Sequence, residues 1–279
     1  MTYTHDTAPT QFVEANGIRF AYRRFGKPGT VPLVLNQHFT GTMDYWDPAV
    51  TDGLAKTREI ILFNNAGVAN SSGETPSSFQ EMGANAIAFI RALGLETVDV
   101  LGFSIGGMVA QEIAVQAPDL VRKLILVGTG HRGADMSQSQ SSAIFGASYD
   151  EPERLWLSVH FTPSQKSQAA GLTFLARKLR RQDRDPDVNE QTVTAQLEAI
   201  GKYMAPSEDE GALDYLRTIR QPVLVVQGSN DVIIPTIHSY TLQQTLPDAQ
   251  LIIYPDANHG SFYQYPEKFV AEATLFLGA

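Results

Sequence analysis

A Gly-x-Ser-x-Gly pentapeptide at residues 102–106 constrains this chain more than any other feature, because of what surrounds it. The apolar run Val98–Leu101 predicts a buried strand before it, and apolar spacing predicts a helix from Ile105 that ends before Pro118. Ser104 would then lie in a sharp, strained turn with its hydroxyl exposed, the arrangement called a nucleophile elbow. The following helix would point free N–H groups at an oxyanion formed there. A plain glycine-rich strand-to-helix turn is the competing interpretation.

The rest of the chain repeats this alternation of strand and helix. Residues 11–25 hold two alternating runs joined by Asn16-Gly17, which predicts an antiparallel hairpin. Short apolar runs predict further strands at 31–35, 59–63, 124–127, 222–226 and 250–254, with helices at 77–93, 235–246 and 262–278. We therefore expect an α/β fold, a mostly parallel sheet with helices on both faces.

The alternation stops at about residue 132 and resumes at about residue 221. The segment between contains helical patterns at 151–160, 164–181 and 188–204, and it is too long for a simple loop. We predict a core of residues 1–131 and 216–279 with a helical cap at 132–215. Trp156 and Met204 would line a substrate pocket, unless they only pack the cap against the core. The basic run 177–181 is expected to be a solvated helix end balanced by nearby aspartates.

Composition excludes several classes of protein. The chain has 279 residues, 43% hydrophobic and 18% charged, as expected for a soluble globular protein. Its net charge of -9 argues against a nucleic-acid partner. It has no cysteine, so thiolate metal sites and cysteine nucleophiles are excluded. No signal pattern or membrane-spanning run is present, so we expect a cytoplasmic protein without membrane contact, as a monomer or a homodimer.

A serine nucleophile needs a base, and the base needs an acid that orients it. Residues just after the carboxyl ends of parallel strands share one sheet edge, which favours His38, His131 and His259 among the six histidines. His259 follows the last strand in a flexible Asn-His-Gly loop, and Asp231 follows the strand before it. Asp256 is too near His259 in sequence to orient it freely, and Asp135 is a second candidate. The competing interpretations are a turn-forming Asp231 and a His259 that caps the last helix.

The order Ser104, Asp231, His259, in the motifs GFSIGG, GSNDVIIP and ANHGSF, resembles the α/β-hydrolase superfamily over nearly the whole chain. The resemblance implies an eight-stranded α/β-hydrolase fold with Ser104 as nucleophile, His259 as base and then acid, and Asp231 as the orienting acid. It also implies an oxyanion hole made by the backbone N–H groups of Ile105 and Phe39. Gln37-His38 stands where the family usually has His-Gly. The His38 ring would either enter the pocket or pack beneath the loop.

These features predict a serine hydrolase that acts on a small to medium, largely apolar ester or lactone through an acyl-enzyme. No cofactor or metal is expected. His38, His131, Trp156 and Met204 are the candidate pocket residues. The alternatives are a C–C bond hydrolase or enol-lactonase of aromatic catabolism, and a cofactor-free haloperoxidase or perhydrolase. A slow-turnover receptor for a small ligand is the alternative outside enzymes.

Overall fold

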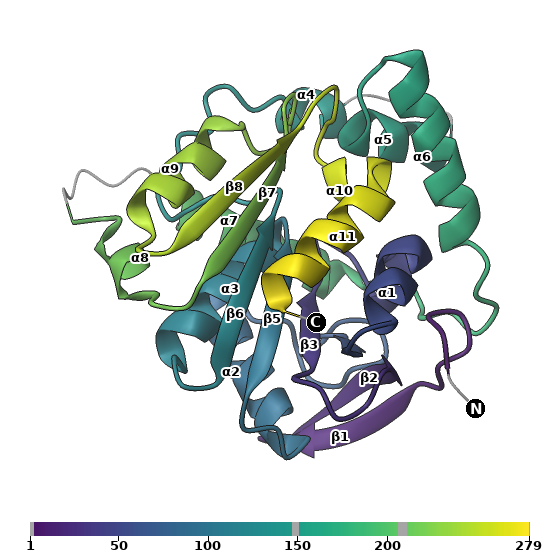
Figure 1. Cartoon of the computed structure of the whole chain (residues 1–279), viewed down its shortest axis with the longest axis vertical. Coiled ribbons are helices and arrows are strands. Elements are labelled where there is room, and N and C mark those ends of the chain that lie inside the picture. Colours follow the sequence, from purple (N-terminus) through teal and green to yellow (C-terminus); the bar gives the residue numbers. More distant parts are fainter. Residues whose placement is uncertain (1–2, 147–150, 206–210, 279) are drawn as a thin grey trace.

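The computed structural model describes residues 3–146, 151–205 and 211–278. An eight-stranded sheet with the order β1-β2-β4-β3-β5-β6-β7-β8 runs through the molecule (Figure 1). β1 and β2 pair antiparallel to each other, β2 pairs antiparallel to β4, and the other neighbours are parallel. The strands are β1 Gln11–Ala15, β2 Ile18–Gly26, β3 Leu33–Asn36, β4 Glu59–Phe63, β5 Val98–Phe103, β6 Val121–Val127, β7 Val223–Gly228 and β8 Ala249–Tyr254. The predicted fold class is confirmed.

The N-terminal hairpin forms at the predicted turn. Asn16 and Gly17 both have positive φ, 51° and 77°, as a two-residue hairpin turn of matching twist requires. In the central strands, successive side chains point to opposite faces, so a continuous apolar run fills two cores at once. In β3, Leu33 and Leu35 belong to one core and Val34 to the other.

Each face of the sheet is covered by its own helices. Residues of α2 Phe79–Ala92, α3 Ile105–Gln116 and α9 Ile237–Thr245 fill one core. Residues of α1 Pro48–Ala55, α10 Ser261–Gln264 and α11 Pro266–Leu277 fill the other. A short 3-10 helix, η1 Met43–Tyr45, precedes α1. In the described part of the chain, no helix is long and apolar enough to cross a membrane.

The segment between β6 and β7 contains five helices among its described residues: α4 Ser141–Gly146, α5 Pro152–His160, α6 Gln165–Lys178, α7 Glu190–Met204 and α8 Asp214–Thr218. Phe161 and Phe174 around α5 and α6 join the core that contains α10. Ala199 and Tyr203 of α7 join the opposite core. The inserted helices therefore contribute to the hydrophobic cores on both faces of the sheet. The division into core and cap at residues 132 and 215 stays a prediction.

The helices differ from the expectation in several places, and α4 and α8 were not predicted. The predicted final helix 262–278 is two helices, because proline at position 266 has no N–H to continue the first one and begins the second. Helix α1 was not predicted. Asp47 caps it, its side chain accepting from the N–H of Ala49 at 2.9 Å, and Pro48 occupies its first position.

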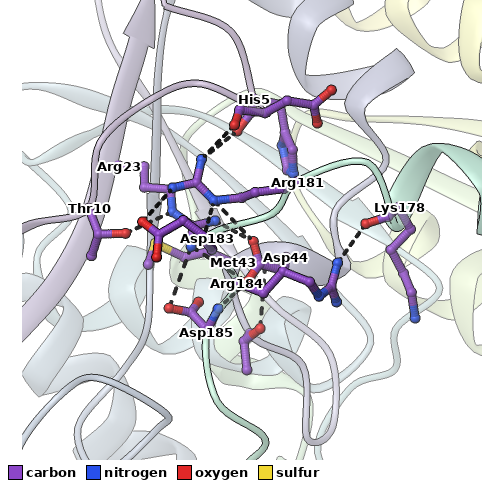
Figure 2. Close-up of polar contacts among 12 residues, drawn as sticks. His5, Thr10, Arg23, Met43, Asp44, Lys178, Arg181, Asp183, Arg184 and Asp185 are labelled. Carbon is purple, nitrogen blue, oxygen red and sulfur yellow. Dashed lines mark hydrogen bonds and ion pairs between the residues drawn. The ribbon is translucent and has the colours of Figure 1, made fainter.

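The prediction of a solvated basic helix end is wrong. Arg177 makes two hydrogen bonds to the buried Asp47 carboxylate, at 2.8 and 2.6 Å. Arg181 is 4% exposed and lies 3.7 Å from Asp44, which also pairs with Arg23 of β2 (Figure 2). The sequence pattern cannot show that these arginines pair with buried carboxylates of the core, because the partners lie far away in the chain. The network holds the chain after α6 to the edge of the core.

Candidate active site

Ser104 lies between β5 and α3 in a conformation that is rare for a residue with a side chain. Its φ is 57° and its ψ is −122°. A Cβ at Gly102 would lie 2.2 Å from the Gly106 carbonyl oxygen, and one at Gly106 would lie 2.1 Å from the Asn36 carbonyl oxygen. Only glycine at these two positions lets the backbone segments approach so closely. The strained turn at Ser104 depends on this close packing. Thr129 donates to the Ser104 carbonyl at 2.8 Å and holds the turn from β6's loop.

His259 and Asp231 meet at the same edge of the sheet. His259 Nδ1 lies 2.8 Å from Asp231 Oδ2, and both side chains are buried. The other oxygen, Oδ1, accepts from the backbone N–H groups of Ile233 and Ile234 at 2.8 and 2.9 Å. These donors fix the carboxylate, so the second oxygen is left to orient the imidazole.

The His259 ring lies beside the elbow. Its centroid is 4.9 Å from that of Phe103, the residue before Ser104. A Cβ on Gly128, at the end of β6, would lie 3.3 Å from His259 Nδ1. The small residue at 128 thus leaves room for the ring over the strand ends. The structure places His259 against Asp231 and against Phe103, the residue before Ser104. The catalytic roles of these residues stay a prediction.

Asn258 is a functional candidate that sequence reasoning missed. Its Oδ1 accepts from the N–H groups of Val232 and His259, both at 2.9 Å, and joins the loops of the acid and the base. Its Nδ2 donates to the Ser158 carbonyl at 3.1 Å and so reaches α5. The position next to His259 was the only available signal, because an asparagine in a loop is ordinarily a turn former.

The two other acids considered for His259 lie elsewhere. Asp135 is exposed and accepts from the N–H and hydroxyl of Ser137 at 2.9 and 3.0 Å. These bonds lower the pKa of its carboxyl. Asp256 accepts from the hydroxyls of Thr162 and Ser164, both at 2.6 Å, which hold the His259 loop against the segment between α5 and α6. Neither carboxylate is arranged to orient His259.

The loop after β3 has His38 where the family usually has glycine, and the backbone of His38 is not in the positive-φ region. Within 36–41, the positive φ falls at Thr40, at 57°. Side-chain amides fix the loop instead: Gln37 Oε1 accepts from the N–H of His38 at 2.9 Å, and Gln196 Oε1 of α7 accepts from the N–H of Thr40 at 2.8 Å. Phe39 lies between these two anchors. Ile105 is the first residue of α3, so its N–H has no partner within the helix.

The His38 ring lies among aromatic rings at the site. Its centroid is 5.4 Å from Phe103, 5.6 Å from Tyr45 and 5.3 Å from Trp156, in edge-on contacts. His160, set aside by its place in the insertion, stacks on Trp156 at 4.3 Å and lies 5.9 Å from His259. Of the predicted pocket residues, His38 and Trp156 therefore lie near His259.

The other two predicted pocket residues lie in the loop after β6 and at the end of α7. His131 packs against the His238 ring, 5.2 Å between centroids, with its Nδ1 2.9 Å from the Arg132 carbonyl oxygen. The Met204 methyl group lies near Gly130 and packs against the core. No group of three or more histidine and carboxylate side chains that could hold a metal occurs among the described residues.

Comparison with known proteins identifies the family. A model of the alpha/beta hydrolase fold matches residues 31–266. The chain belongs to this family. A solved alpha/beta hydrolase fold protein from Chitinophaga pinensis is 45% identical, with a TM-score of 0.92, and the match covers 99% of this chain and 100% of that one.

Two curated relatives of this hydrolase-fold protein are more distant. The pimeloyl-[acyl-carrier protein] methyl ester esterase of Nitrosomonas europaea is 31% identical over 182 residues, 62% of this chain and 68% of the relative. The 2-hydroxymuconate semialdehyde hydrolase of Pseudomonas putida is 25% identical over 236 residues, 80% of this chain and 78% of the relative. The family tolerates different reactions on one scaffold.

Burial gives this hydrolase-fold protein several histidines that resist protonation. Desolvation lowers the pKa of His38 to about 3 and that of His160 well below its ordinary value. Near the N-terminus, His5, whose Nδ1 lies 3.0 Å from Thr51 Oγ1, has its pKa lowered to about 3, also mainly by burial. All three imidazoles are therefore neutral at pH 7 in the folded protein.

These pKa values predict loss of stability in mild acid. Below the ordinary value of 6.5, the unfolded chain binds protons at His5, His38 and His160 that the folded chain does not. The free energy of unfolding then falls as pH falls, by about 1.4 kcal/mol per pH unit for each such histidine. Denaturant titrations between pH 7.5 and 5 measure the slope. His5→Gln should reduce it by one histidine's share, and a flat profile would contradict the assignment.

Proposed function

We propose that this protein is a serine hydrolase that cleaves a small to medium, largely apolar carboxylic ester or lactone. The observation that carries the proposal is the 2.8 Å contact between His259 Nδ1 and Asp231 Oδ2 beside the strained Ser104. An acid–imidazole pair next to a serine in a strained turn is the arrangement that activates a hydroxyl at neutral pH.

In the proposed mechanism, Ser104 Oγ attacks the carbonyl carbon while His259 takes the hydroxyl proton. The alcohol leaves with that proton, and an acyl-enzyme remains. Water then attacks the acyl carbon, His259 takes a proton from it, and the acid is released as Ser104 recovers its proton. Asp231 holds the Nδ1–H side of the ring and stabilises the imidazolium in both steps. With a lactone, the leaving alcohol stays attached to the acyl group.

The oxyanion would be stabilised by the backbone N–H groups of Ile105 and Phe39. Ile105 begins α3, whose N-terminus favours negative charge. Phe39 follows the position of the usual glycine, and the bonds from Gln37 and Gln196 on either side hold its backbone in place. In this loop, hydrogen bonds to two amide side chains fix the backbone path at the position where the family usually has glycine.

Several observations favour an ester or lactone as substrate. One relative is named as a methyl ester esterase. The rings of His38, Trp156 and His160 pack together beside His259, and they come from both the core and the proposed cap at 132–215. We propose that they line the substrate site. Such a lining suits a small apolar molecule better than a polymer or a nucleic acid.

Labelling with a fluorophosphonate probe tests the proposal. We expect one adduct, located by mass spectrometry on the peptide that contains Ser104, and none in Ser104→Ala. Ser261→Ala, which removes another buried hydroxyl, should still be labelled. Folded protein that resists labelling would refute the hydrolase proposal. Turnover of p-nitrophenyl esters against lactones then ranks the substrates, and one slow turnover with tight binding would indicate a receptor.

A further inference from the structure

Lys178 is the last residue of α6 and is only 7% exposed. Its Nζ lies 4.0 Å from the Trp156 ring centroid and 4.2 Å from that of Tyr45, so it contacts one ring of the insertion and one of the core. Its carbonyl oxygen accepts from Arg184 at 2.7 Å, and Figure 2 shows the side chain directed away from the ion-pair network. The ammonium thus points toward the two rings, and the charges of Arg184, Asp187, Glu153 and Asp44 act on it without a direct ion pair.

Two carboxylates of the core are already paired, and those of Asp187 and Glu153 act on the ammonium only through longer-range attraction. Asp44 pairs with Arg23, and Asp47 with Arg177. Among the described residues, no oxygen lies within hydrogen-bond distance of Lys178 Nζ. The two rings supply cation–π attraction but no acceptor for the three N–H donors. Burying an ammonium without acceptors is unfavourable, so an incoming anion would gain hydrogen bonds that the protein leaves unmade.

The ammonium is connected to the candidate site by a series of ring contacts. Trp156, beneath Lys178 Nζ, stacks on His160, and the His160 ring lies 5.9 Å from the His259 ring. Trp156 also meets the His38 ring at 5.3 Å. Lys178 is therefore linked to the His259 ring through Trp156 and His160. Burial lowers its pKa to about 8, so the amine is still mostly protonated at pH 7.

We propose that Lys178 binds a carboxylate at the end of the substrate remote from the bond that Ser104 cleaves. The inference rests on the proposed hydrolase function and narrows its substrate to an ester or lactone with an apolar middle and one anionic end. The apolar part would lie along the rings of Trp156 and His38, and the carboxylate would accept from Lys178 Nζ. The alternative is that Lys178 only supports the packing of Trp156 against Tyr45.

Two esters of equal chain length separate these roles: the mono-p-nitrophenyl ester of adipate, which ends in a carboxylate, and p-nitrophenyl hexanoate, which ends in a methyl group. We expect Lys178→Met to lower the ratio of kcat/KM for the adipate ester to that for the hexanoate at least tenfold. Arg180→Met, which removes an exposed cation two residues away, should leave the ratio at its wild-type value. Equal losses on both esters, or an unchanged ratio, would overturn the proposal.

A binding measurement keeps this test separate from hydrolysis itself. Adipate should quench the fluorescence of Trp156 in Ser104→Ala, and the added Lys178→Met change should raise its dissociation constant at least tenfold. If neither ester is cleaved but adipate binds through Lys178, the proposed function fails and the anion site stands. If the esters are cleaved and adipate binding does not depend on Lys178, the anion site is wrong and the hydrolase proposal survives.

Discussion

Ser104→Ala should lower kcat for ester hydrolysis by at least about 10³-fold, because nucleophile, base and acid act as a unit. The backbone φ of 57° fixes the place of this hydroxyl in the turn. The substitution removes one oxygen and keeps the Cβ, so circular dichroism and the unfolding midpoint should stay close to wild type. Steady-state kinetics with a p-nitrophenyl ester measure the loss.

The residual rate of Ser104→Ala is informative as well. The oxyanion donors and the binding surface remain, so activity above the uncatalysed rate is expected to persist. Substrate binding should persist too, which makes this variant the one for trapping complexes. Wild-type turnover in the folded variant would refute Ser104 as the nucleophile.

Asp231→Asn should lower kcat by about 10³- to 10⁴-fold. An amide at this position donates where the carboxylate accepts, so its NH₂ would face His259 Nδ1 and favour the tautomer that cannot accept the Ser104 proton. The amide oxygen can still accept from Ile233 and Ile234, as Oδ1 does now at 2.8 and 2.9 Å, and the loop should keep its shape. The expected defect is therefore in kcat, with little change in stability.

Asp135→Asn is the matched control for the acid. Its carboxylate is exposed and bonded to Ser137, so the same change of charge there should alter kcat by less than about threefold. If Asp135→Asn proved the damaging substitution and Asp231→Asn the mild one, the assignment of the acid would be reversed. Both variants should be compared at the same pH and ionic strength, because surface charge effects are screened by salt.

The residues now proposed as catalytic could be selected from sequence because their positions follow from chain connectivity. Asp231 and His259 each come after a short apolar run, and the carboxyl ends of parallel strands share one edge. Ser104 could be recognised by the glycines on either side of it. Both must lack a Cβ, because backbone atoms approach these two positions closely. These signals are local in the chain, so a single sequence contains them.

The contacts between the insertion and the core could not be selected in this way. His160 looked like any histidine on a helix, yet it stacks on Trp156 beside His259. Lys178 looked like part of a solvated basic run, yet it is buried against Tyr45. The core partners of these side chains, His259 and Tyr45, lie far away in the sequence and on other segments. Helical periodicity does not specify which surface a helix meets.

The sequence by itself determined the alternation of strands and helices, the turn at 102–106 and the two loops that contain Asp231 and His259. These features could be recognised from turn residues and from the spacing of apolar residues, which are signals that extend over only a few residues of the chain. The tertiary structure alone decided that the amides of Gln37 and Gln196 hold the loop at Phe39, and that Lys178 is buried against the rings of Trp156 and Tyr45. Those features depend on which charges and rings the packed elements bring together, and burial then gives the unpaired groups their chemistry.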